Sequence, residues 1–310
     1  MQHASLKGLI AATHTPFHDD GSLKLAVVAK QADHLLSNHV TTVFIGGSTG
    51  ESHSLSLSER IALSQRWFEV VNGTCLRVVV HVGSNCLADA RTLASQAEQL
   101  GAAAISALSP SYFKPRSLDM LIACVGDIAA AAPQTPFYFY DIPVLTGVNF
   151  SMPEFLEQAG NRIPNLAGIK FTNPDLMAFQ LCLRADSGKW DVPFGCDEFL
   201  LAALALGAKG AVGSSFNFAS PIYHRMMAAF ERGELATARE EQFRSVRLIQ
   251  LLASYGYMGA AKAVMGMLGV PVGPARLPNG TLSVEQVSLL KSKLEEMGFF
   301  EWVKAVKARQ

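Results

Sequence analysis

One lysine at the end of a buried strand is the residue in this sequence best suited to covalent chemistry. Lys170 follows Leu166-Ala-Gly-Ile, an apolar run that predicts a strand covered on both faces. A free lysine amine has a pKa of about 10.4, and burial lowers that pKa toward the neutral nucleophile that a Schiff base requires. The alternative is a lysine that reaches solvent or pairs with a carboxylate.

A glycine-rich turn follows the predicted strand Thr42–Ile45. Its sequence, Gly46-Gly-Ser-Thr-Gly-Glu51, lets the backbone approach a ligand and presents successive N–H groups to an anion. Ser48 and Thr49 add hydroxyl donors suited to a carboxylate or a phosphate. The spacing is neither that of a P-loop nor that of a dinucleotide fingerprint. The alternative is a tight turn with a purely structural role.

Four further polar residues lie at or just after predicted strand ends. Tyr140 closes Phe137-Tyr-Phe-Tyr, where alternation places both tyrosines on one face, and its phenol could relay a proton or be an ordinary core aromatic. The acids Asp197 and Glu198 open an apolar helix, where capping and the helix dipole favour acids in any case. His81 is predicted to be structural, since no second ligand lies at metal-binding spacing from it. No metal site is predicted.

The positions above are organised by eight apolar, strand-like runs that alternate with amphipathic helices. This pattern predicts an α/β fold, specifically a (β/α)8 TIM barrel whose active site lies at the carboxyl ends of the strands. The predicted strands are Leu9–Thr13, Thr42–Ile45, Arg77–Val82, Ala103–Ala107, Phe137–Tyr140, Leu166–Lys170, Val192–Gly195 and Gly210–Gly213. The predicted helices between them are Leu25–Leu36, Ser58–Val71, Leu87–Leu100, Leu118–Ala131, Met152–Ala159, Asp175–Leu183 and Glu198–Leu206.

The last third of the chain shows only helical patterns. They span Pro221–Arg232, Leu235–Tyr255, Gly259–Leu268 and Ser283–Met297. Because no linker separates them from the strands, we expect residues 1–220 to form the barrel and residues 221–310 to form a helical extension packed on it within the same domain.

Composition narrows the possible partners and the compartment. The chain has 310 residues, of which 49% are hydrophobic and 17% are charged, and its 26 basic residues balance 26 acidic ones. This balance disfavours binding to nucleic acids or anionic membranes. The five cysteines form no C-x-x-C pair, which fits a reducing compartment better than disulfides or a zinc site. Without a signal-peptide pattern or a spanning apolar stretch, we expect a cytoplasmic protein.

Taken in order, the motifs resemble those of the N-acetylneuraminate lyase / dihydrodipicolinate synthase family of class I, pyruvate-dependent aldolases. The matching stretches are Gly46–Glu51, Tyr140-Asp-Ile-Pro-Val-Leu-Thr-Gly147, Gly168-Ile-Lys-Phe-Thr172, Gly195-Cys-Asp-Glu198 and Gly213-Ser214, and the likeness runs from about Leu6 to Pro278. The resemblance implies that Lys170 is the Schiff-base lysine and that Tyr140 transfers protons. It further implies that Ser48 and Thr49 hold the pyruvate carboxylate, and that neither a metal nor an organic cofactor is needed.

The branch of the family is indicated by residues outside this common set. Leu145 stands where the synthase branch typically has an arginine, and the sialate-lyase branch also carries leucine there. The positions that resemble the sugar-tail contacts of sialate lyases are Thr172, Gly195, Asp197, Glu198 and Ser214. The expected reaction is reversible cleavage of N-acetylneuraminate, with a small 2-keto sugar acid and pyruvate as the ligands.

Other activities remain open at this point. One is a different family aldolase or dehydratase acting on a 2-keto-3-deoxy sugar acid, or the dihydrodipicolinate synthase reaction. Another is a non-catalytic sugar-acid sensor, which would not require a nucleophile. The resemblance also implies a homotetramer in which Tyr112 reaches a neighbouring active site. Asp141 departs from the His or Asn more usual after the tyrosine.

Overall fold

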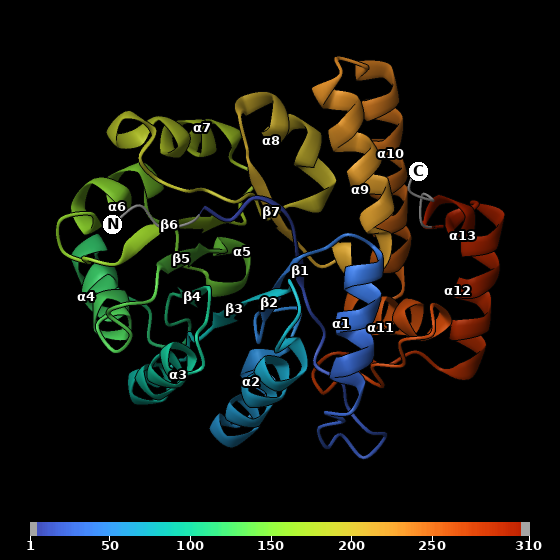
Figure 1. Ribbon diagram of the computed structural model, residues 1–310, viewed down its shortest axis with the longest axis horizontal. Helices are drawn as coiled ribbons and strands as arrows, with labels where there is room; N and C mark the ends of the chain where they lie inside the picture. The colour runs from blue at the N-terminus through green and yellow to red at the C-terminus, as the bar shows by residue number, and fades with distance from the viewer. Residues whose placement is uncertain (1–4, 305–310) are drawn as a thin grey trace.

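The structure is a computed structural model that describes residues 5–304. A curled parallel sheet lies at its centre (Figure 1). The sheet has seven strands in the order β6-β5-β4-β3-β2-β1-β7. The strands are β1 Gly8–Ala12, β2 Thr42–Ile45, β3 Arg77–His81, β4 Ala104–Leu108, β5 Phe137–Asp141, β6 Leu166–Phe171 and β7 Gly210–Gly213. Each agrees within one residue at each end with a predicted strand. Sequence patterns therefore located these seven strands well.

The predicted strand Val192–Gly195 is wrong as a regular strand. Only isolated parallel bridges are formed there, joining Phe194 to Phe171 of β6 and to Ala211 of β7. The Phe194 amide donates a hydrogen bond to the Gly210 carbonyl at 3.0 Å, a length typical of a sheet. Pro193 has no N–H to donate, so a continuous ladder cannot form through this segment. Residues 5–304 thus form seven strands and an irregular segment between the two edge strands, β6 and β7.

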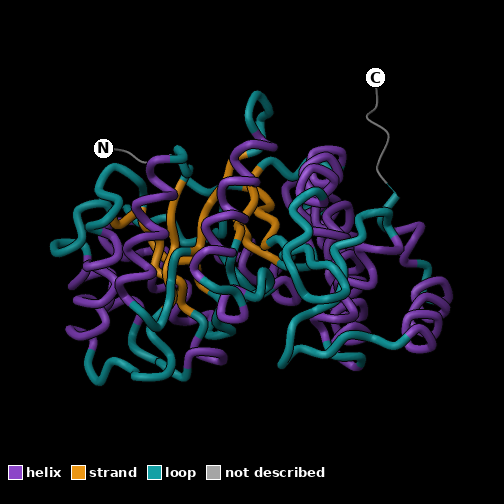
Figure 2. The backbone as a smooth tube through the Cα atoms, turned by 90° about the horizontal axis from the view of Figure 1, so that it is seen from below, coloured by secondary structure: helices purple, strands orange, loops and turns teal. Residues whose placement is uncertain are grey.

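Helices cover the outside of the sheet and continue beyond it (Figures 1 and 2). Those that follow the strands are α1 Val27–Ser37, α2 Leu57–Val71, α3 Leu87–Gln99, α4 Leu118–Ala129, α5 Pro143–Thr146, α6 Met152–Ala159, α7 Leu176–Arg184 and α8 Leu200–Leu206. Short 3-10 turns are η1 Ser52–Ser54, η2 Ala185–Gly188 and η3 Asp197–Phe199. Helix α5 and the first two 3-10 turns were not predicted, because elements of three or four residues leave no periodic pattern.

The last helices are α9 Phe216–Glu231, α10 Leu235–Ser254, α11 Tyr257–Met267, α12 Val284–Glu296 and α13 Phe299–Trp302. The prediction that the first of these begins at Pro221 is wrong, since α9 begins five residues earlier at Phe216. Its proline lies inside the helix, where Ala219 departs from helical geometry with φ −133°. That kink accommodates the missing N–H of the proline. None of the helices in the described range is long and apolar enough to cross a membrane.

Two apolar clusters follow the alternation of the strands. Phe137 and Phe139 belong to the larger cluster between the sheet and its helices. Tyr138 and Tyr140 belong to a smaller cluster inside the curl of the sheet, together with Phe44 and other strand residues. The prediction that the two tyrosines share one face is confirmed. Side chains of the inner face therefore meet one another across the interior.

Candidate active site

Lys170 lies on the inner face near the carboxyl end of β6. It is 4% exposed, and its Nζ lies 3.5 Å from the centre of the Tyr140 ring and 3.9 Å from that of Phe44. Among the described residues, no carboxylate lies within ion-pair distance of this amine. Burial holds the pKa of Lys170 well below its ordinary value, and the nearby Asp197 only partly opposes this. The alternatives of a solvent-reaching or paired lysine are therefore excluded.

Tyr140 stands beside this lysine because the two residues are in register on neighbouring strands. Its hydroxyl oxygen lies 3.4 Å from Ser48 Oγ, and its ring packs edge-on against His81 and Phe44 at 5.8 Å. Burial raises the pKa of Tyr140 to about 12, against the effect of the Ser48 and Thr172 hydroxyls. The phenol is therefore protonated at neutral pH and can donate a proton next to the amine.

The turn from Gly46 to Glu51 carries two residues with hydroxyl groups. Ser48 and Thr49 are both partly buried there. A Cβ on Gly47 would lie 2.5 Å from the Phe44 ring, and one on Gly50 would lie 3.1 Å from the Gly46 backbone. These close approaches favour glycine, so the turn is tight, and it places the Ser48 hydroxyl near the phenol of Tyr140.

His81 contacts the backbone of this turn. Its Nδ1 lies 2.9 Å from the Gly46 carbonyl oxygen, and Arg60 Nη2 donates to the His81 carbonyl at 2.7 Å. Burial, followed by the charge of Arg60, holds the pKa of His81 well below its ordinary value. A neutral ring can donate its Nδ1 proton to Gly46. The structural role predicted for His81 agrees with these contacts.

The opposite wall carries the polar residues of the segment between β6 and β7. A Cβ on Gly195 would lie 1.9 Å from Thr172 Oγ1, and one on Gly213 would lie 2.2 Å from Asp197 Oδ1. Both glycines are thus needed for the close packing of their neighbours. Thr172 Oγ1 is buried and has no hydrogen-bond partner among the described residues.

Asp197 does not cap its own helix. Its Oδ2 accepts a hydrogen bond at 2.9 Å from the amide of Ser215, just before α9, and a second from the Ser215 hydroxyl. From that hydroxyl a buried chain continues to Tyr223 at 2.6 Å and then to Ser245 at 2.7 Å. Burial raises the pKa of Asp197 to about 7, although the Ser215 bonds oppose this rise. The capping explanation is wrong for Asp197, because η3 has Cys196 at its N-cap and no side-chain cap.

Several neighbours of the site gave no signal in the sequence. Ser215, Tyr223 and Ser245 lack any motif, and Tyr257 of α11 is likewise unremarkable, yet its hydroxyl lies 2.8 Å from Ser214 Oγ. These residues come from helices that follow the sheet in the chain. Only the packing of α9, α10 and α11 beside the strands reveals them.

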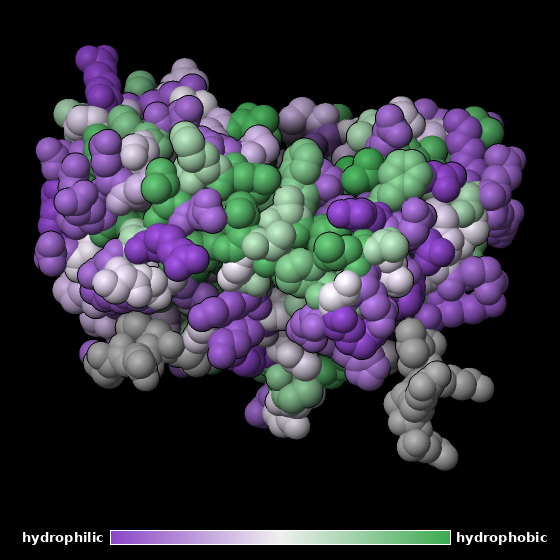
Figure 3. Space-filling model, turned by 90° about the horizontal axis from the view of Figure 1, so that it is seen from above, coloured by the Kyte–Doolittle hydropathy of each residue, from purple (hydrophilic) through white to green (hydrophobic). Residues whose placement is uncertain are grey.

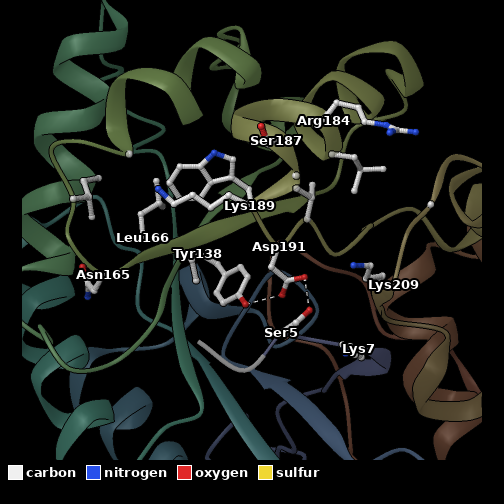
Figure 4. Close-up of a pocket in the computed structure, with 18 of the residues that line it drawn as sticks. Ser5, Lys7, Tyr138, Asn165, Leu166, Arg184, Ser187, Lys189, Asp191 and Lys209 are labelled. Carbon is white, nitrogen blue, oxygen red and sulfur yellow. Dashed lines mark hydrogen bonds between the residues drawn. The ribbon is translucent and has the colours of Figure 1, made fainter. Parts of the chain in front are cut away.

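The other end of the sheet contains a cavity of about 1500 Å³ that is separate from this site (Figure 4). It lies at the amino ends of β5, β6 and β7. Tyr138 and Ser5 each donate a hydrogen bond of 2.7 Å to Asp191 there. The inner face thus carries Lys170 and Tyr140 at one end and the hydrogen bond between Tyr138 and Asp191 at the other.

The comparisons with known proteins agree with this arrangement. A sequence model of the dihydrodipicolinate synthetase family matches residues 5–297. The chain belongs to this family. The resemblance inferred from the motifs is confirmed.

Relatives within the dihydrodipicolinate synthetase family carry more specific names. N-acetylneuraminate lyase A of Xenopus laevis is 41% identical over 276 residues, covering 88% of this chain and 90% of that protein. The solved N-acetylneuraminate lyase of Proteus mirabilis superposes with a TM-score of 0.93 at 39% identity, covering 96% of this chain and 100% of that one. That of Aliivibrio salmonicida, a sialic acid aldolase, has a TM-score of 0.92 at 39% identity, covering 99% and 100%.

Three family-related positions lie away from Lys170 or on the surface. Leu145 is 62% exposed on α5, and Tyr112 is 80% exposed and packs edge-on against Phe113 at 5.0 Å. Side chains alternate along β5, so Asp141 lies on the same face as Phe137 and Phe139, toward the helices and away from Lys170. Burial raises the pKa of Asp141 to about 6, and Asn173 Nδ2 donates to it at 3.2 Å.

Proposed function

We propose that this protein is a Schiff-base lyase that reversibly cleaves N-acetylneuraminate to N-acetylmannosamine and pyruvate. The observation that carries this proposal is the buried amine of Lys170, whose pKa burial holds well below its ordinary value, enclosed by aromatic rings beside a protonated phenol. Relatives named N-acetylneuraminate lyase, 36% to 42% identical, support the choice of sugar acid. A class I aldolase of this kind requires no metal or organic cofactor.

The proposed reaction begins with addition of Lys170 Nζ to the C2 ketone of the open-chain sugar acid. Proton transfer from the Tyr140 phenol to the departing hydroxyl releases water and leaves an iminium ion. The resulting Tyr140 phenolate takes the proton of the C4 hydroxyl, and the C3–C4 bond breaks to release N-acetylmannosamine as the aldehyde. The electron pair of the broken bond enters the iminium to form an enamine. Protonation of the enamine carbon and hydrolysis release pyruvate and restore the amine.

The substrate carboxylate is proposed to bind at the glycine-rich turn. The hydroxyls of Ser48 and Thr49 and the backbone N–H groups of the turn are donors suited to an anion. Ser48 Oγ lies 3.4 Å from the Tyr140 hydroxyl. A carboxylate held there has its ketone carbon next to the reacting amine.

The sugar tail is proposed to lie against the wall between β6 and β7. Thr172, Glu198 and Ser214 supply hydroxyl and carboxylate partners, and Gly195 leaves room for the Thr172 side chain. Asp197 contributes through Oδ1 alone, because Ser215 occupies Oδ2. Leu145 offers no positive charge to a second carboxylate, which favours a neutral polyol partner over a charged aldehyde.

The finer description of the fold is also a proposal. We infer that residues 191–195 occupy the position of the eighth strand of a TIM barrel, because they form parallel bridges to both β6 and β7. We also infer that residues 1–220 and 221–310 form one domain, the second part a helical extension of the first. The hydrogen bond from Lys262 of α11 to the Thr15 carbonyl and the ion pair of Lys262 with Glu51 support this.

A cytoplasmic homotetramer is the proposed assembly. Figure 3 looks onto the side where α7, α8 and α10 lie, and apolar side chains gather across the middle of that face. Exposed apolar residues of these elements are Met177 and Leu181 of α7 and Phe243 of α10, at 74%, 54% and 57%. Exposed apolar area of this kind is typical of subunit contacts. Tyr112, which is 80% exposed, is proposed to reach a neighbouring active site.

Covalent trapping tests this function. Borohydride reduction in the presence of pyruvate should attach one pyruvate-derived group per chain, located on Lys170 by peptide mass spectrometry. Lys170→Ala should abolish the adduct. Full labelling of that variant would contradict the assignment, and faster condensation of pyruvate with aspartate semialdehyde than with N-acetylmannosamine would contradict the choice of substrate.

A further inference from the structure

A buried ion pair connects the C-terminal helices to the turn that carries Ser48 and Thr49. Lys262 Nζ of α11 lies 2.6 Å from Glu51 Oε1, and the two side chains are 1% and 0% exposed. The same ammonium donates to the carbonyl oxygens of Thr15 at 3.0 Å and Pro274 at 2.7 Å. These contacts join helix α11 to the turn that ends at Glu51, to the segment after β1 and to the loop that follows α11.

Glu51 is held in a backbone conformation that residues other than glycine seldom adopt. Its φ and ψ are 56° and 36°, in the left-handed region. Its second oxygen, Oε2, accepts hydrogen bonds from the Arg276 amide at 2.8 Å and from Asn279 Nδ2 at 3.3 Å. Such a conformation persists when the surroundings fix it, and here every side-chain partner of Glu51 comes from the C-terminal segment.

The conformation of Glu51 determines where the preceding residues lie. The Glu51 amide donates to the Ser48 carbonyl at 3.0 Å, and Thr15 Oγ1 donates to the Gly50 carbonyl at 2.6 Å. We propose that Lys262, acting through Glu51, is a positioning residue that fixes the Ser48–Thr49 hydroxyls for the substrate carboxylate. This inference rests on the proposed function of the turn.

The position of the ion pair predicts which kinetic quantity changes. The contacts of Lys262 and Glu51 described above include neither Lys170 nor Tyr140. Loosening the turn should therefore weaken the hold on the carboxylate in the ground state and the transition state alike, which raises KM more than it lowers kcat. A lost positioning contact of this kind can cost up to about a hundredfold even far from the reacting atoms.

A pair of charge-neutral double variants tests the inference. Lys262→Met/Glu51→Gln removes both charges and leaves no unpaired buried ion, while the amide oxygen can still accept from Arg276. The matched control is Arg225→Met/Glu241→Gln, which removes an ion pair of 2.9 Å between α9 and α10. For both variants, thermal unfolding, kcat, KM for pyruvate in the condensation direction and the pyruvate concentration that half-saturates borohydride trapping are measured.

The Lys262/Glu51 variant should raise KM and the half-saturating pyruvate concentration by about tenfold or more, with kcat changed by less than about threefold. The Arg225/Glu241 variant should lose thermal stability but keep both pyruvate values. Equal changes in the two variants, or unchanged pyruvate values in the first, would overturn the inference while leaving the proposed function intact. Failure of the native protein to trap pyruvate would overturn both. If the first variant does not fold, Glu51→Gln is compared with Glu241→Gln under the same criteria.

Discussion

Replacing the Tyr140 hydroxyl tests the proton-transfer step directly. In Tyr140→Phe the ring remains, so its edge-on contacts at 5.8 Å with Phe44 and His81 and its position 3.5 Å from Lys170 Nζ are retained. The hydroxyl reaches Ser48 only at 3.4 Å, a long hydrogen bond. Its loss should therefore cost less than about 1 kcal/mol of unfolding free energy. A lost proton donor should instead lower kcat by about 10²-fold to 10⁴-fold.

Tyr138→Phe is the matched control, because it removes a phenol from the same strand and the same face. The Tyr138 hydroxyl donates to Asp191 at 2.7 Å, at the opposite end of the sheet. Loss of a bond to a charged group should cost about 1.5–3 kcal/mol of stability while leaving kcat nearly unchanged. Tyr140→Phe should thus lose more activity but less stability than Tyr138→Phe.

Steady-state kinetics and urea unfolding measure these quantities, and borohydride trapping follows Schiff-base formation. We expect Tyr140→Phe to retain the half-saturating pyruvate concentration of the native protein, because Lys170 and the carboxylate turn are unchanged. A kcat within tenfold of the native value would refute the assignment of Tyr140 as the proton donor. A comparable loss of kcat in Tyr138→Phe would attribute the effect to general damage of the interior.

Three further outcomes are expected. Ser48→Ala/Thr49→Ala should raise KM for pyruvate at least as much as it lowers kcat, and unchanged pyruvate affinity would contradict the carboxylate site. Glu198→Ala should lower kcat/KM for N-acetylneuraminate roughly tenfold to a hundredfold but far less for a 4-hydroxy-2-keto acid without the tail, whereas equal losses would argue against a tail contact. The pKa of Asp197, about 7, and that of Asp141, about 6, are raised by folding, so both groups bind protons more strongly in the folded state and make unfolding free energy fall as pH rises from about 4 to 7. Asp197→Asn should reduce that slope in urea unfolding at several pH values, and an unchanged slope would show that burial of this carboxyl group does not control the pH dependence.

Sequence patterns predicted regular elements well and irregular ones poorly. The seven strands agreed within one residue because each is an apolar run with punctuation at both ends. Val192–Gly195 has the same composition but contains Pro193, whose missing N–H prevents a regular ladder. The predicted helix start at Pro221 was too late in the chain, because α9 begins at Phe216 and continues through Pro221 at a kink.

The sequence by itself determined the chemistry that is available. Lys170 at the end of an apolar strand, two tyrosines on one face of β5 and a glycine-rich turn with two hydroxyls are all local patterns, and local periodicity decides which face a strand side chain occupies. The order of these motifs also identified the family. Burial of the Lys170 amine could be predicted for the same reason, since its strand is apolar on both faces.

Only the tertiary structure decided which distant groups hold these residues in place. Lys262 pairs with Glu51 across more than 200 residues of chain, and Asp197 bonds to Ser215 rather than to its own helix. Neither pairing leaves a periodic signal, because a buried charge is satisfied by whichever partner the packing of helices brings near it. Contacts between remote segments depend on how α9 and α11 pack beside the strands, and local sequence does not encode that geometry.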